Sequence, residues 1–392
     1  MKMKPIFLAI AMPLFIFSCT QEKLEVIPES STYTFSDIDL SKGVSKWLNE
    51  EQQAQFSAAE LAELDALLSD GQLPNDIENR TTVEVPAGSE DALAAAIAEA
   101  GEGGMVVLKA GDHFESATVD INQRITIRGE RGAVLISDVK PLGQVGFVQA
   151  ALHIKDANNV AIVGLTIQPT TAPGGTGILV QNAKRTFVVR NTMNELQLGV
   201  FVEEGDQTRV AQNTVNTSLA WATGELITAS GITILNGNQV RIVGNNANSG
   251  FFGVFSADKN GLYLGNTTNG NAIGHILCKV PTAYPLPDGS VVGSKTSATN
   301  WLSLYNEANQ NAAIGYLVID GAMDNYLAGN EAAGNAVYDI ELAGASERFG
   351  FPTPPSVANT VLVGAGQSVK DCGEDNEVMG GVEVDVAANP CN

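Results

Sequence analysis

The chain has 392 residues but is poor in histidine, cysteine and aromatic side chains, with 3 His, 4 Cys and 6% Phe, Trp and Tyr. Zinc and copper centres are built largely from grouped His and Cys side chains. The three histidines are scattered and no Cys-x-x-Cys pair occurs. We therefore expect neither a resident metal centre nor a cofactor; calcium is the one cation that the many acidic residues leave possible.

Positive charge is also scarce. The 22 Lys and Arg residues face 44 Asp and Glu, for a net charge of −22. A surface with this charge repels nucleic acid, and it repels polyanionic glycans unless cations bridge the two. We expect no nucleic-acid partner, although the same acidity also serves simply to keep an exported protein soluble.

The N-terminal apolar run, Ile6 to Phe17, is too short to span a bilayer and follows Lys2 and Lys4. The next two residues, Ser18-Cys19, complete a motif that resembles the lipobox of bacterial lipoproteins, with Phe17 where a small residue is more usual. The resemblance implies cleavage before Cys19 and attachment of several acyl chains to it, which together anchor a protein stably. An ordinary cleaved signal peptide is the alternative.

Three regions follow from this interpretation: a lipoprotein signal peptide at 1–18, a tether with an amphipathic helix at 19–80, and the main domain at 81–392. In the tether, Ser57-Ala-Ala-Glu60 has the pattern of a capping box, and Leu61, Leu64, Leu67 and Leu68 follow at helical spacing. We expect this helix to dock on the main domain or, alternatively, to bind a separate partner. The predicted location is the bacterial cell envelope, with a lipid anchor in the outer membrane and a monomeric chain that contacts the membrane through the lipid alone.

Glycine and asparagine are abundant, and one asparagine recurs after each of several short apolar strands. The recurring residues are Asn191, Asn213, Asn245, Asn266 and Asn330. Their spacing is roughly 20 to 25 residues, with longer intervals where a loop is inserted, and such a period is typical of stacked repeats. Stacked asparagines form an internal ladder of amide hydrogen bonds, so we interpret these residues as structural.

The segment before the repeats has its own pattern. It contains a helix at Asp91–Glu99, the turn Gly101-Glu-Gly-Gly104 and strands at Met105–Leu108, Ala117–Ile121 and Arg124–Arg128. This order resembles the N-terminal cap and first coil of right-handed parallel β-helices of the pectate-lyase-like superfamily. The resemblance implies an all-β fold: a single-stranded right-handed parallel β-helix of about ten coils with a capping helix. At the other end, Cys372 and Cys391 bracket the tail, and in an oxidising envelope we expect them to form a disulfide that closes it.

Enzymes of this superfamily usually place catalysis on the outer face of the first sheet. Alternation along each Gly-Ile-x-Val strand predicts the outward set His153, Leu179, Phe201, Thr233, Phe255, Ile276, Leu317 and Asp339. The middle of this set is apolar. It has neither the paired carboxylates of a glycoside hydrolase nor the base with Arg or Lys of a polyuronate lyase. The resemblance therefore covers the scaffold and transfers no catalytic residue.

Candidate site residues lie at the ends of this face and in long loops. Asp339 and Glu341, alternate residues of one strand, and His153 at the opposite end are the candidates for catalysis. The loops at 168–176, 216–230, 281–299 and 344–359 are unusually long. Aromatic side chains stack on sugar rings, or they fix their own loops, so the candidate ligand contacts are Phe201, Phe255, Trp221, Tyr284 and Trp301.

The leading functional hypothesis is a non-catalytic glycan-binding or surface-structural module. A polysaccharide lyase, glycoside hydrolase or epimerase is the alternative, and a scaffold for another envelope protein is a third possibility. Copper delivery, known for a related β-helix family, is disfavoured by the few histidines and scattered methionines.

Overall fold

The computed structural model describes residues 80–217, 229–279, 284–346, 352–386 and 391. The predicted signal peptide, Cys19, the helix at 57–69 and Trp221 lie outside these residues. In the described part of the chain no helix has the length and apolar character needed to cross a membrane.

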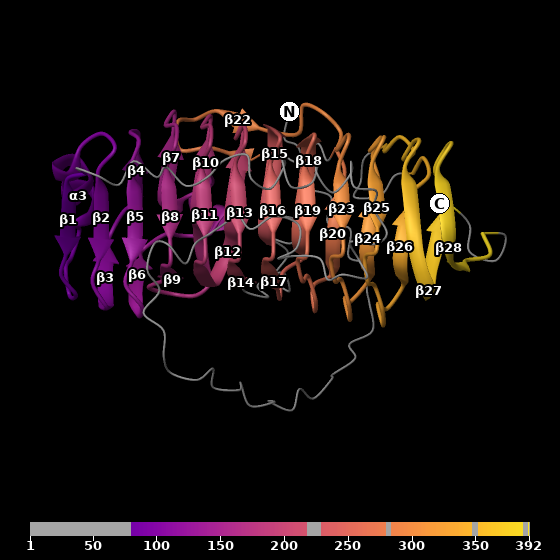
Figure 1. Cartoon of the computed structure of the whole chain (residues 1–392), viewed down its shortest axis with the longest axis horizontal. Coiled ribbons are helices and arrows are strands. Elements are labelled where there is room, and N and C mark those ends of the chain that lie inside the picture. Colours follow the sequence, from indigo (N-terminus) through magenta and orange to yellow (C-terminus); the bar gives the residue numbers. More distant parts are fainter. Residues whose placement is uncertain (1–79, 218–228, 280–283, 347–351, 387–390, 392) are drawn as a thin grey trace, which may run out of the picture. The chain divides into compact units, whose positions relative to one another are not determined.

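Short strands stacked in parallel make up the fold (Figure 1). Each strand is hydrogen-bonded to the strand one coil further on: β10 (Gly174–Gln181) pairs with β12 (Thr192–Glu203), and β11 (Phe187–Val189) pairs with β13 (Arg209–Ala211). The pairing keeps its register within most strand pairs, as the repeating sequence requires, and shifts between Asn194 and Leu196, Leu235 and Asn238, and Val363 and Ser368. The predicted single parallel β-helix is confirmed.

The strands form three stacks, one on each side of the coil. The first stack consists of β4 (Val119–Ile121), β7 (Ala150–Lys155), β10, the end of β12, β15 (Ser230–Asn238), β18 (Phe252–Lys259), β20 (Ile273–Leu277), β24 (Ile314–Val318), β26 (Tyr338–Leu342) and the end of β27 (Thr360–Asp371). The second stack consists of β1 (Thr82–Val85), β2 (Met105–Leu108), β5 (Thr126–Gly129), β8 (Ala161–Val163), β11, β13, β16 (Arg241–Val243), β19 (Leu262–Leu264), β23 (Leu302–Leu304), β25 (Tyr326–Ala328), the start of β27 and β28 (Glu377–Glu383). The third consists of β3 (Gly111–Glu115), β6 (Ala133–Ser137), β9 (Thr166–Pro169), the start of β12, β14 (Thr214–Thr217) and β17 (Asn246–Asn248).

The N-terminal end of the coil interior is covered by helix α3 (Leu93–Ala100), close to its predicted position. Its buried side chains Leu93, Ala96 and Ile97 belong to the same apolar cluster as the coil interior. A second, one-turn helix, α4 (Leu142–Val145), lies in the connection between β6 and β7. The capping helix predicted from the sequence is therefore present.

The interior also holds the predicted asparagine ladder. The Nδ2 atom of Asn191 donates to Oδ1 of Asn213 at 3.1 Å, and Asn213 donates in the same way to Asn245 at 2.9 Å. The ladder continues through Asn266 to Asn306 and Asn330, each step at 2.9 Å. Asn306 was missing from the predicted series. Two further ladders, Asn271–Asn311–Asn335 and Asn325–Asn359–Asn376, line other turns.

Cys372 and Cys391 form the predicted disulfide, with their Cα atoms 5.5 Å apart. The third described cysteine, Cys278, is buried on the outer side of the first stack and is not part of a disulfide. The bridge ties Cys391 to the residue that directly follows β27.

One residue of the coil interior carries an ionisable side chain. Asp258 is fully buried, and among the described residues neither carboxylate oxygen has a hydrogen-bond partner. Gly237 and Ala298 occupy the same place in the neighbouring coils, as the bridges from Lys259 to Asn238 and Thr299 show. Burial raises the pKa of Asp258 well above its ordinary value of 3.8.

We expect Asp258→Ala to raise the free energy of unfolding at pH 8 by about 1–3 kcal/mol. Because the pKa is raised in the folded state, the part of the penalty that comes from ionisation is absent below pH 3.8 and grows as the pH rises towards the folded-state pKa. Urea unfolding at pH 4 and pH 8 should therefore show the larger gain at pH 8. An equal gain at both values would contradict the assignment, and Asp112→Ala, at an exposed aspartate of β3, is the matched control.

Candidate functional site

The outer face of the first stack carries the predicted apolar row. Backbone pairing aligns Leu179 with Phe201, Phe255 with Ile276, and Ile276 with Leu317. The next residue in the row is Glu341, because β26 places Glu341 beside Leu317. The sequence analysis had put Asp339 in that place, so the predicted register at this strand was wrong by two residues.

A segment inserted between β20 and β23 covers this row. We call residues 284–296 the strap; it contains the hairpin of β21 (Tyr284–Pro285) and β22 (Val291–Val292). Tyr284 and Leu286 are each 1% exposed and belong to one apolar cluster with Leu179, Phe201 and Phe255. The Tyr284 and Phe201 rings lie 5.1 Å apart. Figure 1 shows β22, in orange, beside the much earlier strands in magenta.

Polar contacts hold the strap at the N-terminal end of the row. The Val148 amide donates to the Pro285 carbonyl at 2.7 Å, and Lys155 Nζ lies 3.0 Å from Asp288 Oδ2. Hydrogen bonds from Ser290, with a further contribution from Lys155, hold the pKa of Asp288 well below its usual range. Asp288 therefore stays anionic and keeps its contact with Lys155 throughout the physiological pH range.

His153 lies in the same polar group. Its Nδ1 is 3.0 Å from Asp120 Oδ1 and its Nε2 is 3.0 Å from Gln181 Oε1. Gln181 in turn donates to Asp288 at 3.4 Å. The imidazole is 3% exposed, so the candidate catalytic histidine lies beneath the strap as part of its attachment.

The two candidate acids do not form a pair that faces solvent. Asp339 accepts hydrogen bonds from the Ser368 amide at 2.8 Å and from Asn335 Nδ2 at 2.9 Å. Glu341 is 2% exposed, and its strand neighbour in β27 is Lys370. His153 lies in β7, many coils away from β26, so the three candidates are not brought together.

The aromatic residues predicted to contact a ligand are buried. Phe201, Phe255, Tyr284 and Trp301 are at most 1% exposed. Trp301 points into the coil interior, where its Nε1 donates to the Asp258 carbonyl at 3.2 Å and its ring lies 4.7 Å from Tyr263. These four side chains stabilise the interior and the strap, and in this structure they are not accessible to a ligand.

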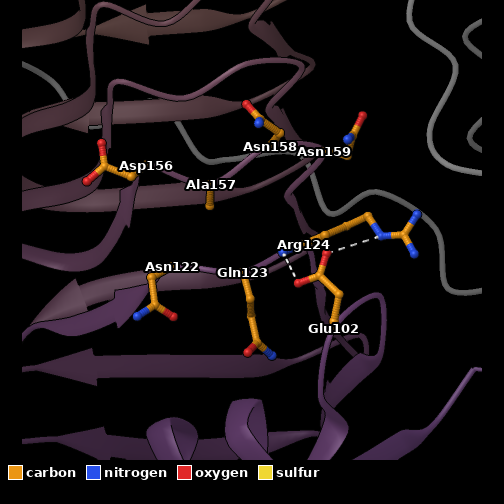
Figure 2. Close-up of a pocket in the computed structure, with 8 residues that line it drawn as sticks. All are labelled: Glu102, Asn122, Gln123, Arg124, Asp156, Ala157, Asn158 and Asn159. Atoms are coloured by element: carbon orange, nitrogen blue, oxygen red, sulfur yellow. Dashed lines mark hydrogen bonds and ion pairs between the residues drawn. The ribbon is translucent and has the colours of Figure 1, made fainter.

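A polar surface pocket of about 380 Å³ lies where the chain turns away from β4 and β7 (Figure 2). It is lined by Glu102, Asn122, Gln123, Arg124, Asp156, Ala157, Asn158 and Asn159. Glu102 accepts from the Arg124 backbone amide at 3.2 Å and lies 3.8 Å from its guanidinium, while Gln123 donates to the Ile97 carbonyl at 2.9 Å. The sequence analysis missed this pocket because its turns come from separate coils.

The pocket continues into a row of turn residues, one per coil. Backbone bridges connect Asn158, Lys184, Asp206 and Asn238 in this order; the pairing of β15 with β18 continues the row to Lys259, and a further bridge leads to Thr299. We call these six residues the turn row. All are partly or fully exposed, and most offer amide, ammonium or carboxylate groups. Because successive coils are about 4.8 Å apart, the row presents polar groups at a regular spacing.

Comparison with solved structures defines the class of fold. The polygalacturonase from Erwinia carotovora ssp. carotovora is 12% identical, with 78% of this chain and 94% of that chain covered and a TM-score of 0.53. The A-module of the mannuronan C-5 epimerase AlgE6 from Azotobacter vinelandii is 15% identical, covering 75% and 90%, with a TM-score of 0.45. ORF18 of Geobacillus virus E2 is 15% identical with a TM-score of 0.47; the chain spans only 59% of its length. The chain thus has the right-handed parallel β-helix fold that this polygalacturonase also has.

At the sequence level, a family model described as a periplasmic copper-binding protein, NosD, matches residues 109–282. This range is less than half of the chain. No curated protein matches.

The residues present do not fit a copper site. His113 Nε2 lies 2.7 Å from the Lys109 carbonyl, and His153 contacts Asp120 and Gln181. His275 is enclosed in the coil interior, where burial lowers its pKa to about 3. Within the described ranges no three His, Cys, Asp or Glu side chains are grouped closely enough to hold a metal ion. We therefore derive no copper chemistry for this chain.

Proposed function

We propose that this chain is a non-catalytic β-helix module of the bacterial cell envelope that binds a glycan along the turn row. The observation that carries the proposal is the polar pocket that continues into one exposed polar residue per coil. The face that would otherwise offer a groove, the outer side of the first stack, is covered by the strap. Among the described residues, the turn row is an extended polar surface that the strap leaves exposed.

The chemistry of the row suits a neutral polysaccharide. Asn side chains both donate and accept hydrogen bonds, as sugar hydroxyls do. A polymer with repeated hydroxyls can meet equivalent groups on successive coils, which are about 4.8 Å apart. Polyuronates are disfavoured because the net charge of −22 repels them.

An envelope location fits three observations. The matching family model describes a periplasmic protein, the Cys372–Cys391 disulfide is of the kind that persists in oxidising compartments, and Ser18-Cys19 resembles a lipobox. Lipid attachment at Cys19 and anchoring in the outer membrane belong to the proposal.

The test is affinity electrophoresis against a panel of neutral and uronic polysaccharides. We expect retardation by a neutral member, and we expect Asn122→Ala/Asn158→Ala to weaken it about tenfold, the effect of two lost hydrogen bonds. Asn246→Ala, at an exposed asparagine in β17 and outside the turn row, is the matched control. Retardation by no polysaccharide, or equal weakening by the control, would overturn the proposal.

A further inference from the structure

The outer face of the second stack carries a second apolar row, which the function proposed above does not use. Phe187 and Val189 of β11 alternate with the inward Val188, and the pairing carries this alternation through β13, β16 and β19. We call this surface the back face; its members are Phe187, Val189, Arg209, Ala211, Arg241, Val243, Leu262 and Leu264.

The back face is buried. Its apolar side chains are at most 2% exposed, and Arg209 and Arg241 are each 4% exposed. Outward-facing side chains of a sheet become buried only where another layer packs on them. The described residues form two apolar clusters, the coil interior and the row beneath the strap, and neither includes this face.

We propose that residues 57–69 of this same chain cover the back face as an amphipathic helix. The leucine stripe of Leu61, Leu64, Leu67 and Leu68 would pack on the apolar row. The segment is acidic, with Glu60, Glu63 and Asp65 beside the stripe. Buried guanidinium groups favour anionic neighbours, and in this position the segment would bring its carboxylates close to Arg209 and Arg241.

The length of a helix over residues 57–69 matches the extent of the back face. A helix over residues 57–69 is about 20 Å long. The back face and β23, which continues it, run over five strands, or about 19 Å. The ten or so residues between the helix and Arg80 can span up to about 33 Å when extended. The distance from β1 to β11 is four inter-strand steps, about 19 Å in total, so this connection is long enough to reach the back face.

The test is the accessibility of a cysteine introduced at the centre of the back face. Ala211→Cys would be made in the full chain with Cys19→Ser, which leaves the buried Cys278 as the other cysteine outside the disulfide. Labelling with a charged maleimide under native conditions should be slow while residues 57–69 are intact. Leu64→Asp/Leu67→Asp should accelerate labelling at least tenfold, and Ala62→Asp/Ala66→Asp, on the opposite side of the helix, should leave it slow.

Rapid labelling of the intact chain would overturn the proposal. So would slow labelling that persists in Leu64→Asp/Leu67→Asp, because the cover would then be a second copy or another part of the chain. Cys278 is buried, so its labelling in any variant would show that the variant has unfolded as a whole. If the aspartate variant unfolds in this way, the milder Leu64→Ala/Leu67→Ala variant takes its place. None of these outcomes depends on glycan binding.

Discussion

Replacing Asn245 by alanine should lower the free energy of unfolding by about 3–5 kcal/mol, since each buried polar group left without a partner costs about 1–3 kcal/mol. Asn245 Nδ2 donates to the Val210 carbonyl at 2.8 Å and to Asn266 Oδ1 at 2.9 Å. Its Oδ1 accepts from the backbone amide and from Nδ2 of Asn213, at 3.0 and 2.9 Å. Alanine removes all four contacts in the middle of the ladder.

Denaturant unfolding measures this loss, and Asn246→Ala is the control because the adjacent asparagine is exposed. Stacked coils gain much of their stability from their neighbours, so the loss should also appear as faster amide exchange in β13, β16 and β19. If Asn245→Ala were no more destabilising than Asn246→Ala, the ladder would not be the structural element described here.

Replacing Tyr284 by alanine should cost about 3–5 kcal/mol, the usual range for a large buried aromatic side chain. Tyr284 packs against Phe201 and lies in the apolar cluster that joins the strap to the first stack. Without it, the strap loses its main apolar contact and the row beneath is uncovered. We expect a new site for a dye that binds exposed apolar surface, together with a lower unfolding midpoint.

Val291→Ala is the control for this change, since Val291 lies on the same strap but is 62% exposed. Unchanged dye binding and stability in Tyr284→Ala would show that the row is closed by something other than the strap.

Much of the fold could be predicted from the sequence because its signals are local and repeated. The asparagines at Asn191, Asn213, Asn245 and Asn266 mark the same corner of successive coils, and alternation within each strand gives the inward and outward faces. Asn306 was missed although it follows an apolar strand, Leu302–Leu304, in the same way. The register of β26 was misassigned because the alternation of Asp339 and Glu341 fits two alignments.

The site was much harder to predict. The sequence identified the apolar row on the first stack but not its cover, because the strap contacts residues far away in the chain: Lys155 and Asp288 are separated by 133 positions. An apolar row on an outer face is itself a signal for a cover, since exposing it to water is unfavourable. The pocket at Asn122 and Asn158 has no sequence motif, because polar turn residues occur in every coil.

The most direct test of the account is a search for turnover. The purified chain, with Cys19 replaced, would be incubated with neutral and uronic polysaccharides in the presence of calcium, and new reducing ends and unsaturated products would be measured. We predict binding of a neutral polysaccharide without product release. Release of product that is lost on replacing His153, Asp339 or Glu341 by alanine would contradict the account and establish a polysaccharide lyase or hydrolase.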